Sequence, residues 1–152
     1  MSARQSIVVS QAAAKDAEAV IALDLAVRPN GDRAELIGRA IAAGQCLIAR
    51  VDGGVAGYAV LTQSFYGYGF IELLIVHADY RRRGVATALV RACEASSPTE
   101  KLFTSTNQSN VPMQRLCETL GFVRSGMIEN LDEGDPEIVY FKRRGGGANG
   151  TI

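Results

Sequence analysis

A loop of basic and small residues in the middle of the chain has the pattern of an anion site. An apolar run ends at Val76 and a helical pattern begins at Gly84, so the residues between them form a strand-to-helix loop. The N–H groups at a helix N-terminus, together with the positive end of the helix dipole, bind phosphate. The hydroxyl of Thr87 is a further donor. The residues expected to contact a phosphate are Arg81, Arg82, Arg83, Gly84, Val85, Ala86 and Thr87.

The spacing Arg-x-x-Gly-x-Ala within this loop is a weak signal by itself, because three solvated arginines before an ordinary helix give the same sequence. Its position at a strand-to-helix junction favours a binding site. The loop lacks the longer glycine spacing and the Lys-Ser/Thr pair of a Walker P-loop. It also has one glycine where a Rossmann fingerprint has three. Both of those nucleotide-binding motifs are therefore excluded.

A second segment, from Asn110 to Phe122, has a helical pattern with clear ends. Asn110 is expected to cap the helix, Pro112 lies in its first turn and Gly121 ends it. The segment resembles the Asn-x-x-Ala-x-x-Leu-Tyr-x-x-Leu-Gly-Phe segment of the GNAT superfamily of acyl-CoA-dependent N-acetyltransferases. In that superfamily the Arg-x-x-Gly-x-Ala motif binds the coenzyme A pyrophosphate. Because both segments occur in the family's order and spacing, the chain is identified as a member over nearly its whole length.

The resemblance implies acetyl-CoA as the cosubstrate and no metal. In such enzymes the pantetheine arm lies in a V-shaped opening between two splayed parallel strands, here residues 70–76 and 101–105. The arm pairs with main-chain groups of the first strand, and a backbone N–H near its end stabilises charge on the thioester oxygen. The contacts implied are Leu74, Ile75 and Val76 for the arm, Arg81 to Ala86 for the pyrophosphate (with the side chains of Arg82 and Arg83), Asn110 for a further contact and Asn107 as a weaker candidate.

Glu72 is the candidate general base that removes a proton from the attacking amine. It is the only charged residue between Phe70 and Val76. A carboxylate in a buried strand is costly unless it is paired or functional, and desolvation would raise its pKa toward the useful range. The run Glu72-x-Leu74-x-Val76 also resembles the family's pattern in this strand. The alternative is a glutamate at the exposed edge of the sheet, or one paired with an arginine.

Cys117 stands where most members of the family carry the tyrosine that protonates the departing thiolate. A thiol has an ordinary pKa of about 8.5, close to that of the leaving group, so Cys117 is a candidate proton donor. The favoured alternative is a small apolar helix residue without a chemical role. In that case solvent, or Tyr140 on the last expected strand, supplies the proton.

Three further segments bear on the amine acceptor. Residues 65–70 hold four aromatic residues in a predicted hairpin, which suits either a wall around an amine or cross-strand packing. Residues 129–137 hold five acids and no base, which suits either attraction of a cation or a solvated turn. The resemblance places the first two helices, residues 16–43, at the acceptor as well. The candidates there are Asp24, Arg28 and Asn30.

The sequence pattern predicts the strands and helices that position these residues, in the order β-α-α-β-β-β-α-β-α-β-β. This order indicates an α/β fold. We expect a mixed, mostly antiparallel twisted sheet of about seven strands, flanked by helices on both faces, with the splayed parallel pair in its middle. The first two helices are expected to begin with Asp16 as a cap and with an Asp32–Glu35 capping box. The strands are expected at residues 6–10, 45–51, 55–63, 70–76 (buried on both faces), 101–105, from 122 and 137–142, and the later helices at 84–95 and from 110.

Composition limits the remaining function classes. The 152 residues suit one domain, expected over residues 1–144, with a flexible Gly-rich tail at 145–152. Sixteen basic and 16 acidic residues sum to zero, which argues against binding of nucleic acid or of an anionic membrane. Thirteen of the bases are arginine, which suits a phosphate-bearing partner.

No apolar run reaches the ~18 residues of a membrane span, and the N-terminus does not have the pattern of a signal peptide. Three cysteines in apolar segments indicate a reducing compartment, and we expect a cytoplasmic protein.

The function expected from these observations is transfer of an acetyl group from acetyl-CoA to a primary amine, by direct attack in a ternary complex. The acceptor is a small molecule or a peptide. The alternative is a coenzyme-A-binding module with little or no transferase activity, which the cysteine at position 117 keeps open. Family members often form homodimers, so a homodimer is a further expectation.

Overall fold

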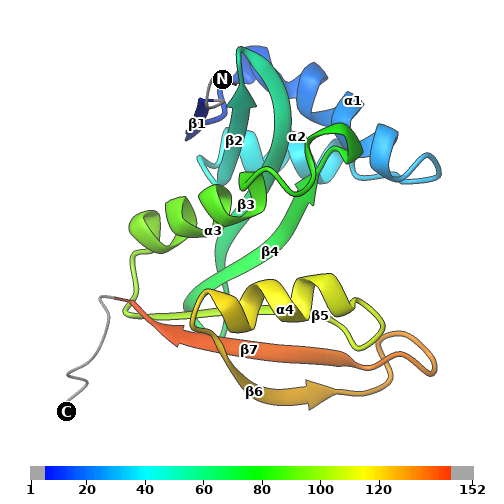
Figure 1. The fold of residues 1–152 in the computed structure, drawn as a ribbon, viewed down its shortest axis with the longest axis vertical. Coiled ribbons are helices and arrows are strands. Elements are labelled where there is room, and N and C mark those ends of the chain that lie inside the picture. Colours follow the sequence, from blue (N-terminus) through cyan, green and yellow to red (C-terminus); the bar gives the residue numbers. More distant parts are fainter. Residues whose placement is uncertain (1–5, 145–152) are drawn as a thin grey trace, which may run out of the picture. The chain divides into compact units, whose positions relative to one another are not determined.

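The computed structural model describes residues 6–144 of the chain, and the predicted Gly-rich tail lies outside the described residues. The elements occur in the predicted order (Figure 1). The strands are β1 (Ile7–Gln11), β2 (Cys46–Val51), β3 (Gly54–Phe65), β4 (Tyr68–Val76), β5 (Lys101–Asn107), β6 (Val123–Ile128) and β7 (Glu137–Arg143). The helices are α1 (Ala17–Val27), α2 (Ala34–Ala42), α3 (Val85–Ser96) and α4 (Val111–Thr119), with 3-10 turns at Ala14–Asp16 and Ala78–Tyr80.

The strands form one seven-stranded mixed sheet in the order β1-β2-β3-β4-β5-β7-β6, which confirms the predicted fold class. β1–β2, β2–β3, β5–β7 and β6–β7 pair antiparallel, whereas β4 and β5 pair in parallel. The parallel pairing joins Gly69, Phe70 and Ile71 to residues 102–104. β4 then continues to Val76 and β5 to Asn107.

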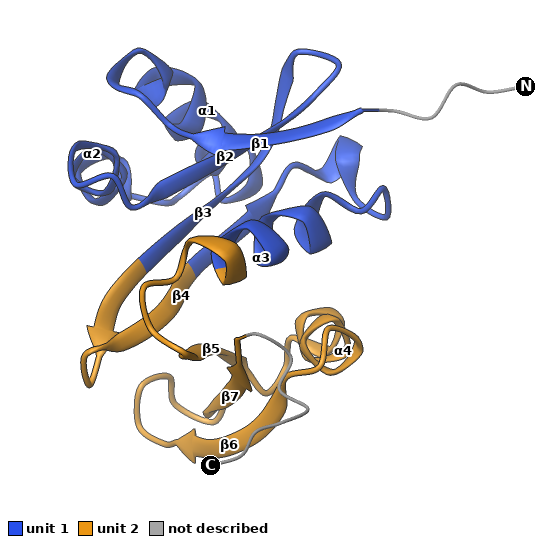
Figure 2. Ribbon diagram, turned by 90° about the vertical axis from the view of Figure 1, so that its left-hand side faces the viewer, with its two compact units in different colours: residues 1–61, 73–93 blue, residues 62–72, 94–152 orange. Residues whose placement is uncertain are grey.

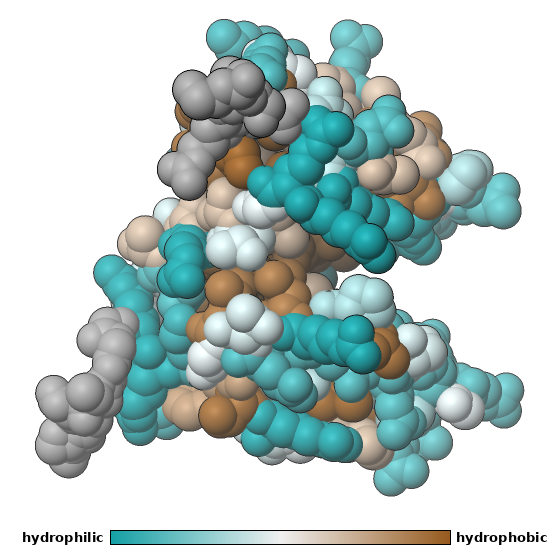
Figure 3. Space-filling view, in the orientation of Figure 1, coloured by the Kyte–Doolittle hydropathy of each residue, from teal (hydrophilic) through white to brown (hydrophobic). Residues whose placement is uncertain are grey.

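The chain forms two compact units, distinguished by colour in Figure 2. Unit 1 comprises residues 1–61 and 73–93, and unit 2 comprises residues 62–72 and 94–152. The single domain over residues 1–144 stays a prediction. In Figure 3 hydrophilic side chains cover much of the visible surface of each unit.

In unit 1 helices cover both faces of the strands. Tyr58 on β3 is fully buried in a core formed with α1 and α2, whose apolar faces supply Val20 and Ile37. The neighbouring residue, Gly57, points to the opposite face because side chains alternate along a strand. There a Cβ at Gly57 would lie 3.2 Å from Leu89 of α3 and 2.7 Å from the carbonyl oxygen of Ile75. The glycine therefore lets α3 and β4 approach β3 closely.

In unit 2 the helix α4 packs on one face of β5 and β7. The residues buried on that face are Leu102, Thr104 and Thr106 of β5, Ile138 and Tyr140 of β7, Cys117 of α4, and Leu120 and Phe122 after it. The ammonium of Lys142 joins three elements, because it donates to the carbonyl oxygen of Leu120 and lies 2.7 Å from Glu94 Oε2 on α3. Its Nζ also lies 5.8 Å from the centre of the Phe122 ring. One cation therefore ties the ends of α3, α4 and β7 together.

Two of the predicted helix caps are wrong and one is confirmed. The Asp16 side chain does not cap α1; its Oδ2 accepts from the Ala13 N–H at 2.8 Å and its Oδ1 from Arg50 at 2.8 Å. The Ala13 hydrogen bond is the main reason that the pKa of Asp16 is lowered. The expected Asp32 capping box is also absent, because Arg33 occupies the cap position. Asn110 does cap α4, accepting from Met113 N–H at 3.2 Å.

The expected complete burial of the fourth strand is also wrong. Only Gly69 and Ile71 of β4 are buried, and the residues from Leu73 to Val76 are half-buried. The apolar run predicted too much burial because an apolar side chain can stay half-exposed in a folded protein, as Leu73 to Val76 do here. The hairpin before β4 turns at Tyr66 and Gly67, both with positive φ, which is the geometry of a type I′ turn.

Replacing Gly57 with alanine tests the close approach of α3 and β4 to β3. The added Cβ meets a backbone oxygen, so we expect Gly57→Ala to lower the free energy of unfolding by about 1–3 kcal/mol. The matched control is Gly38→Ala in α2, where a Cβ meets nothing within 4 Å. That variant should gain about 0.5–1 kcal/mol from helix propensity. Urea unfolding measures both, and an unchanged midpoint for Gly57→Ala would contradict the packing described.

Candidate functional site

The loop between β4 and α3 is held at its start by backbone hydrogen bonds of unit 1. The His77 N–H donates to the carbonyl oxygen of Ala56 on β3 at 2.8 Å. A 3-10 turn follows, in which Tyr80 N–H donates to the His77 carbonyl at 2.9 Å and Asp79 N–H donates to His77 Nδ1 at 3.1 Å. The His77 imidazole therefore caps the 3-10 turn, and these hydrogen bonds hold the backbone that precedes Arg81.

The arginine run has a left-handed backbone at two positions. Arg82 has φ +64° and Gly84 has φ +85°. A left-handed conformation is uncommon for a residue with a Cβ, and strained backbone is concentrated at ligand sites. A Cβ at Gly84 would have Ile7 Cδ1, 3.8 Å away, as its nearest neighbour, so the backbone there is open rather than packed. Alternation of such conformations turns successive N–H groups toward one side, which forms an anion-binding concavity.

Helix α3 begins immediately after Gly84. Its first hydrogen bond runs from the Ala88 N–H to the Gly84 carbonyl at 3.0 Å, so the preceding amides of the first turn have no acceptor within the helix. Val85 is buried and anchors the helix, while Ala86 and Thr87 are half-buried. The structure thus places the predicted loop and helix N-terminus together.

The three arginines of the loop are all exposed, but they differ in their contacts. The Arg83 guanidinium lies 5.6 Å from the centre of the Tyr80 ring, which holds that side chain near the turn. Arg81 and Arg82 form no ion pair with any residue from 6 to 144. Their charges are therefore available to an anionic ligand.

Glu72, the predicted base, is exposed on β4 rather than desolvated. Its Oε2 lies 3.4 Å from Ser64 Oγ of the neighbouring β3, and both residues belong to unit 2. The burial on which the sequence argument depended is absent. An exposed carboxylate reaches water directly, so a role through a water molecule stays a prediction.

The two candidate proton donors lie close together in the core of unit 2. Cys117 is 3% exposed, and burial raises the pKa of its thiol to about 12. Tyr140 is 2% exposed, and burial first, then the charge of Glu118 and the neighbouring Cys117, raise the pKa of its phenol. A thiol with so high a pKa is a weaker acid than the thiol of coenzyme A, which favours the purely structural interpretation of Cys117.

The two candidate asparagines are both engaged within unit 2. Asn107 Nδ2 donates to Asp132 Oδ2 at 2.8 Å and to the Asp135 carbonyl at 3.1 Å. Ser109 donates from its N–H and its hydroxyl to the Asp135 carboxylate, at 2.9 and 2.6 Å. Asn110 caps α4 through its side-chain oxygen. The acidic segment is therefore tied to the turn between β5 and α4, and a contact of either asparagine with the coenzyme stays a prediction.

The aromatic hairpin packs across strands in unit 2. Phe65 stacks on Phe70 with ring centres 5.1 Å apart, and Phe103 of β5 lies 4.9 Å from Phe65 and 5.4 Å from Phe141 of β7. Only Tyr66 at the tip is largely exposed, at 87%. Cross-strand packing, one of the two interpretations of this hairpin, is thus observed, and a wall around an amine stays a prediction.

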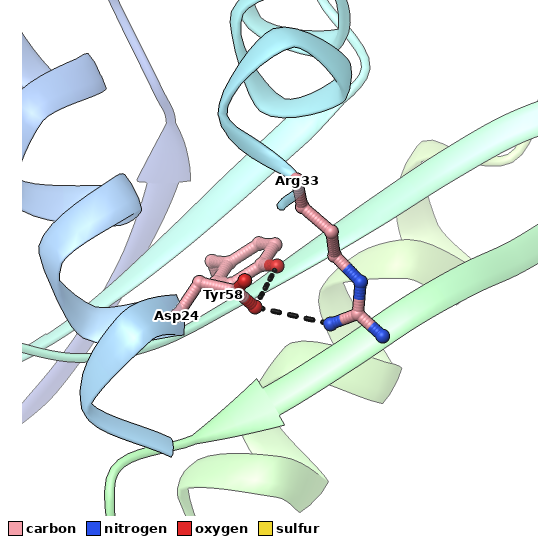
Figure 4. A network of polar contacts seen from close by, with 3 residues as sticks. All are labelled: Asp24, Arg33 and Tyr58. Carbon is pink, nitrogen blue, oxygen red and sulfur yellow. Dashed lines mark hydrogen bonds and ion pairs between the residues drawn. The ribbon is translucent and has the colours of Figure 1, made fainter. Parts of the chain in front are cut away.

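Asp24, a candidate for the acceptor site, is a buried anchor of unit 1 (Figure 4). Its Oδ1 accepts from Tyr58 Oη at 2.7 Å and from Arg33 Nη1 at 3.0 Å. Burial, together with the adjacent Asp24 carboxylate, raises the pKa of Tyr58. Sequence reasoning missed Tyr58 and Arg33. Tyr58 is 34 positions from Asp24 along the chain and Arg33 is nine positions from it, so the three side chains meet only in the folded chain. Arg28 and Asn30 are exposed in the loop that this cluster holds.

Two further observations concern ligands and membranes. Residues 6–144 contain no group of three or more His, Cys, Asp and Glu side chains with the arrangement of a metal site. None of the helices in the same part of the chain has the length and apolar character needed to cross a membrane.

The comparisons with known proteins agree with this geometry. The model of the acetyltransferase (GNAT) family matches residues 13–122. A GNAT-family acetyltransferase from Bacillus cereus is 37% identical with a TM-score of 0.88, over 91% of this chain and 98% of that one. The ribosomal-protein-S18-alanine N-acetyltransferase of Escherichia coli is 16% identical with a TM-score of 0.76, over 97% and 99% of the two chains. Arabidopsis thaliana Naa50, solved with the bisubstrate analogue CoA-Ac-MVNAL, is 20% identical with a TM-score of 0.73, over 90% and 98%. These last two show the fold alone, and no curated protein sequence matches the chain.

The seven-stranded mixed sheet with one parallel pair, β4–β5, is the fold of the GNAT acetyltransferases. The family model covers more than half of the sequence, and the chain belongs to the GNAT acetyltransferase family.

Stability at alkaline pH tests the buried thiols. Burial raises the pKa of Cys117 to about 12 and that of Cys46 to about 11. In the unfolded chain thiols ionise near pH ~8.5, so the folded state loses stability as the pH rises above that value. Each thiol contributes a slope of up to about 1.4 kcal/mol per pH unit until its folded pKa is reached.

We therefore expect Cys117→Ala to unfold with a shallower pH dependence than the parent protein between pH ~9 and ~11. The control is Val60→Ala, which makes a cavity at another buried site but should keep the parental slope. Urea unfolding followed over pH measures both. Equal slopes for the parent and Cys117→Ala would show that the thiol ionises normally in the folded protein.

Proposed function

We propose that the protein transfers the acetyl group of acetyl-CoA to a primary amine, by direct attack within a ternary complex. The observation that carries the proposal is the exposed arginine loop, with left-handed backbone at Arg82 and Gly84, directly before the first turn of α3. In a chain of the acetyltransferase family, this arrangement suits the pyrophosphate of coenzyme A. A Bacillus anthracis acetyltransferase of the same fold, 24% identical, was solved with acetyl coenzyme A.

The described residues fit the coenzyme in charge and in backbone geometry. The amides of residues 85–87 and the guanidinium groups of Arg81 and Arg82 would hold the pyrophosphate. The half-buried strand from Leu74 to Val76 would pair with the pantetheine arm through its main chain. An N–H near the end of this strand would bind the thioester oxygen as negative charge develops there.

Glu72 is proposed to accept the proton of the attacking amine through a water molecule. The amine nitrogen forms a bond to the thioester carbon, the carbon–sulfur bond breaks, and the sulfur leaves as a thiolate. We propose that solvent protonates this thiolate. Burial raises the pKa values of both Cys117 and Tyr140, so neither side chain is a good proton donor. A thiolate is a good leaving group near neutral pH, so its prior protonation is not required.

The acceptor is proposed to be a cationic amine, on a small molecule or a peptide. Glu129 and Glu133 lie in an exposed acidic segment of unit 2, and negative charge raises the local concentration of an ammonium substrate. Two enzymes of the same fold, the S18-alanine N-acetyltransferase and the Naa50 complex with CoA-Ac-MVNAL, have names that point to peptide amines. We also propose a cytoplasmic location, because Cys46 and Cys117 are buried thiols, which suits a reducing compartment.

A coenzyme-A-binding module with little transferase activity is the second candidate. It is favoured by one observation, the buried Cys117 in place of the usual tyrosine. Release of free thiol from acetyl-CoA, measured with a broad panel of amines, separates the two candidates. Binding of acetyl-CoA without thiol release for any amine would favour the module, and failure to bind acetyl-CoA would exclude both.

Variants of the loop test the coenzyme site. Arg82→Gly keeps the left-handed backbone and removes one guanidinium, and we expect affinity for acetyl-CoA to fall about tenfold, the loss of one charge-assisted hydrogen bond at an exposed site. Gly84→Ala adds a Cβ in open space but strains the backbone, with a similar expected loss. Arg39→Ala, on the exposed face of α2, is the control and should bind as the parent does. Calorimetric titration with acetyl-CoA measures the affinity of each variant. If both loop variants bind as tightly as the parent protein, the coenzyme does not bind at this loop.

Replacing Glu72 with glutamine tests the base. We expect kcat/KM to fall about 10²–10⁴-fold with little change in acetyl-CoA affinity, and the acidic limb of its pH profile to disappear. Ser64→Ala removes the hydrogen bond that the Ser64 hydroxyl donates to this carboxylate and serves as a mild control. An unchanged pH–rate profile in Glu72→Gln would exclude the role.

A further inference from the structure

Arg33 is a half-buried cation that uses only part of its capacity to form hydrogen bonds. Its side chain is 21% exposed, and its Nη1 donates to Asp24 Oδ1 at 3.0 Å. A guanidinium carries five N–H donors, and within residues 6–144 those of Arg33 contact only Asp24 and the adjacent Tyr58 hydroxyl. None of its nitrogens is enclosed without a partner, so the remaining N–H groups reach solvent. Figure 4 shows one terminal nitrogen turned away from Asp24 and Tyr58.

The contact with Asp24 holds this guanidinium in one place. Asp24 is 1% exposed, and its Oδ1 also accepts from Tyr58 Oη at 2.7 Å. Burial raises the pKa of Tyr58, so the phenol keeps its proton and remains a donor to Asp24. Arg33 is thus fixed at one edge and has free donors at the other edge. A guanidinium held in this way can bind a carboxylate with little further loss of side-chain entropy.

The backbone around Arg33 is fixed as well. The Arg33 carbonyl oxygen accepts from Ile37 N–H at 2.8 Å at the start of α2. In the loop before it, Arg28 N–H donates to the Asp24 carbonyl oxygen and Gly31 N–H donates to the Arg28 carbonyl oxygen, both at 2.8 Å. A Cβ at Gly31 would lie 3.6 Å from Asp24 Oδ2, so the loop passes close to the buried carboxylate. Main-chain and side-chain contacts therefore both hold Arg33 in position.

This cluster belongs to the core that packs against the strand proposed to hold the pantetheine arm. Tyr58 lies in the core formed by α1, α2, β2 and β3, and Leu73 and Ile75 of β4 pack against that core. All of these residues belong to unit 1. Helix α3 packs on the opposite face of β3, at Gly57. An acceptor that reaches the end of β4 from the side of α1 and α2 would therefore meet Arg33, while the coenzyme approaches from the side of α3.

We propose that Arg33 determines acceptor specificity, by binding the carboxylate of a small amine substrate such as an amino acid. This role rests on the proposed function and narrows its acceptor to amines that also carry a carboxylate. Asp24 and Tyr58 are positioning residues, which act on the substrate through Arg33. A carboxylate accepts parallel N–H donors of a guanidinium and matches its charge, whereas a carboxamide does not. A peptide amine is the less favoured acceptor, because an uncharged peptide bond replaces the carboxylate next to its amine.

Paired substrates test the proposal, with turnover measured as free thiol released from acetyl-CoA. Each amino acid of a panel is compared with its carboxamide, which keeps the attacking amine and removes the carboxylate. We expect kcat/KM of the parent protein to favour the acids by about tenfold or more. Arg33→Lys keeps a cation beside Asp24 but lacks the planar fork, and it should lose most of this preference. The control is Arg39→Gln on the exposed side of α2, which should keep the preference.

Variants of the buried partners separate specificity from folding. Arg33→Gln alone would leave the buried Asp24 carboxylate without a cation, which is destabilising. The double variant, D24N with R33Q, removes both charges, and parental affinity for acetyl-CoA would show that it is folded. It should turn over acids and carboxamides without the parental preference. Tyr58→Phe removes one donor to Asp24, and it should raise KM for the acids more than KM for the carboxamides, with kcat little changed.

A binding measurement distinguishes this proposal from the proposed function. In an NMR titration the Nε–H signal of Arg33, assigned by its loss in Arg33→Lys, should shift with N-acetylglycine and not with N-acetylglycinamide. If that shift occurs but no amine releases thiol, the carboxylate site is supported and the proposed transfer is contradicted. A parent protein without the shift overturns the carboxylate site, as does an active parent that has no preference for acids. A D24N/R33Q variant that keeps the preference, or a higher kcat/KM for peptide amides than for amino acids, also overturns it.

Discussion

The close approach of β4 and α3 to β3 at Gly57 is the constraint that positions the arginine loop of unit 1. A Cβ at this position would lie within 2.7 Å of the Ile75 carbonyl and within 3.2 Å of Val85 and Leu89. Because no side chain intervenes, the end of β4 and the start of α3 are held against the same strand. The loop that joins them, residues 77–84, therefore starts and ends on fixed elements, and it contains the left-handed residues Arg82 and Gly84.

Charged groups that are buried or half-buried join other elements within each unit. In unit 1 the Asp24 carboxylate accepts from Tyr58 of β3 and from Arg33 beside α2, which holds the loop between α1 and α2. In unit 2 the Lys142 ammonium bonds to Glu94 and to the Leu120 carbonyl, although Glu94 Oε1 finds no hydrogen-bond partner of its own. Each cluster joins three segments through one charged group. Removing one partner would leave a buried charge uncompensated, which costs more than the pair contributes.

The zero net charge of the chain is the sum of a basic loop in unit 1 and an acidic segment in unit 2, among other charges. Arg81 and Arg82 are exposed in the loop of unit 1, whereas Asp132 and Asp135 are tied by Asn107 and Ser109 in unit 2. These hydrogen bonds order the acidic segment without neutralising it, because Asn and Ser carry no charge. A basic site for an anionic cosubstrate and an acidic site for a cationic acceptor are compatible with a neutral total. Sequence composition alone gives no sign of this separation.

Local patterns in the sequence determined the element order, the α4 cap at Asn110 and the arginine loop before α3. These features depend on neighbours within a few residues, through helix capping, turn geometry and hydrophobic periodicity. The same reasoning failed for Asp16 and Asp32, where a distant arginine or a shifted helix start competes with the local cap. It also overestimated the burial of β4 and of Glu72.

Tertiary structure alone decided the features that join distant residues. The Asp24–Tyr58–Arg33 cluster, the register of the aromatic residues around Phe103 and the exposed edge of β6 all depend on which strands become neighbours. The raised pKa of Cys117 likewise follows from burial of the inner face of α4, which no local pattern predicts. The sequence by itself therefore determined the family and the position of the arginine loop before α3, because both are carried by contiguous residues. Burial, charge pairing and strand edges were decided only by the fold, because they are properties of residues brought together from far apart in the chain.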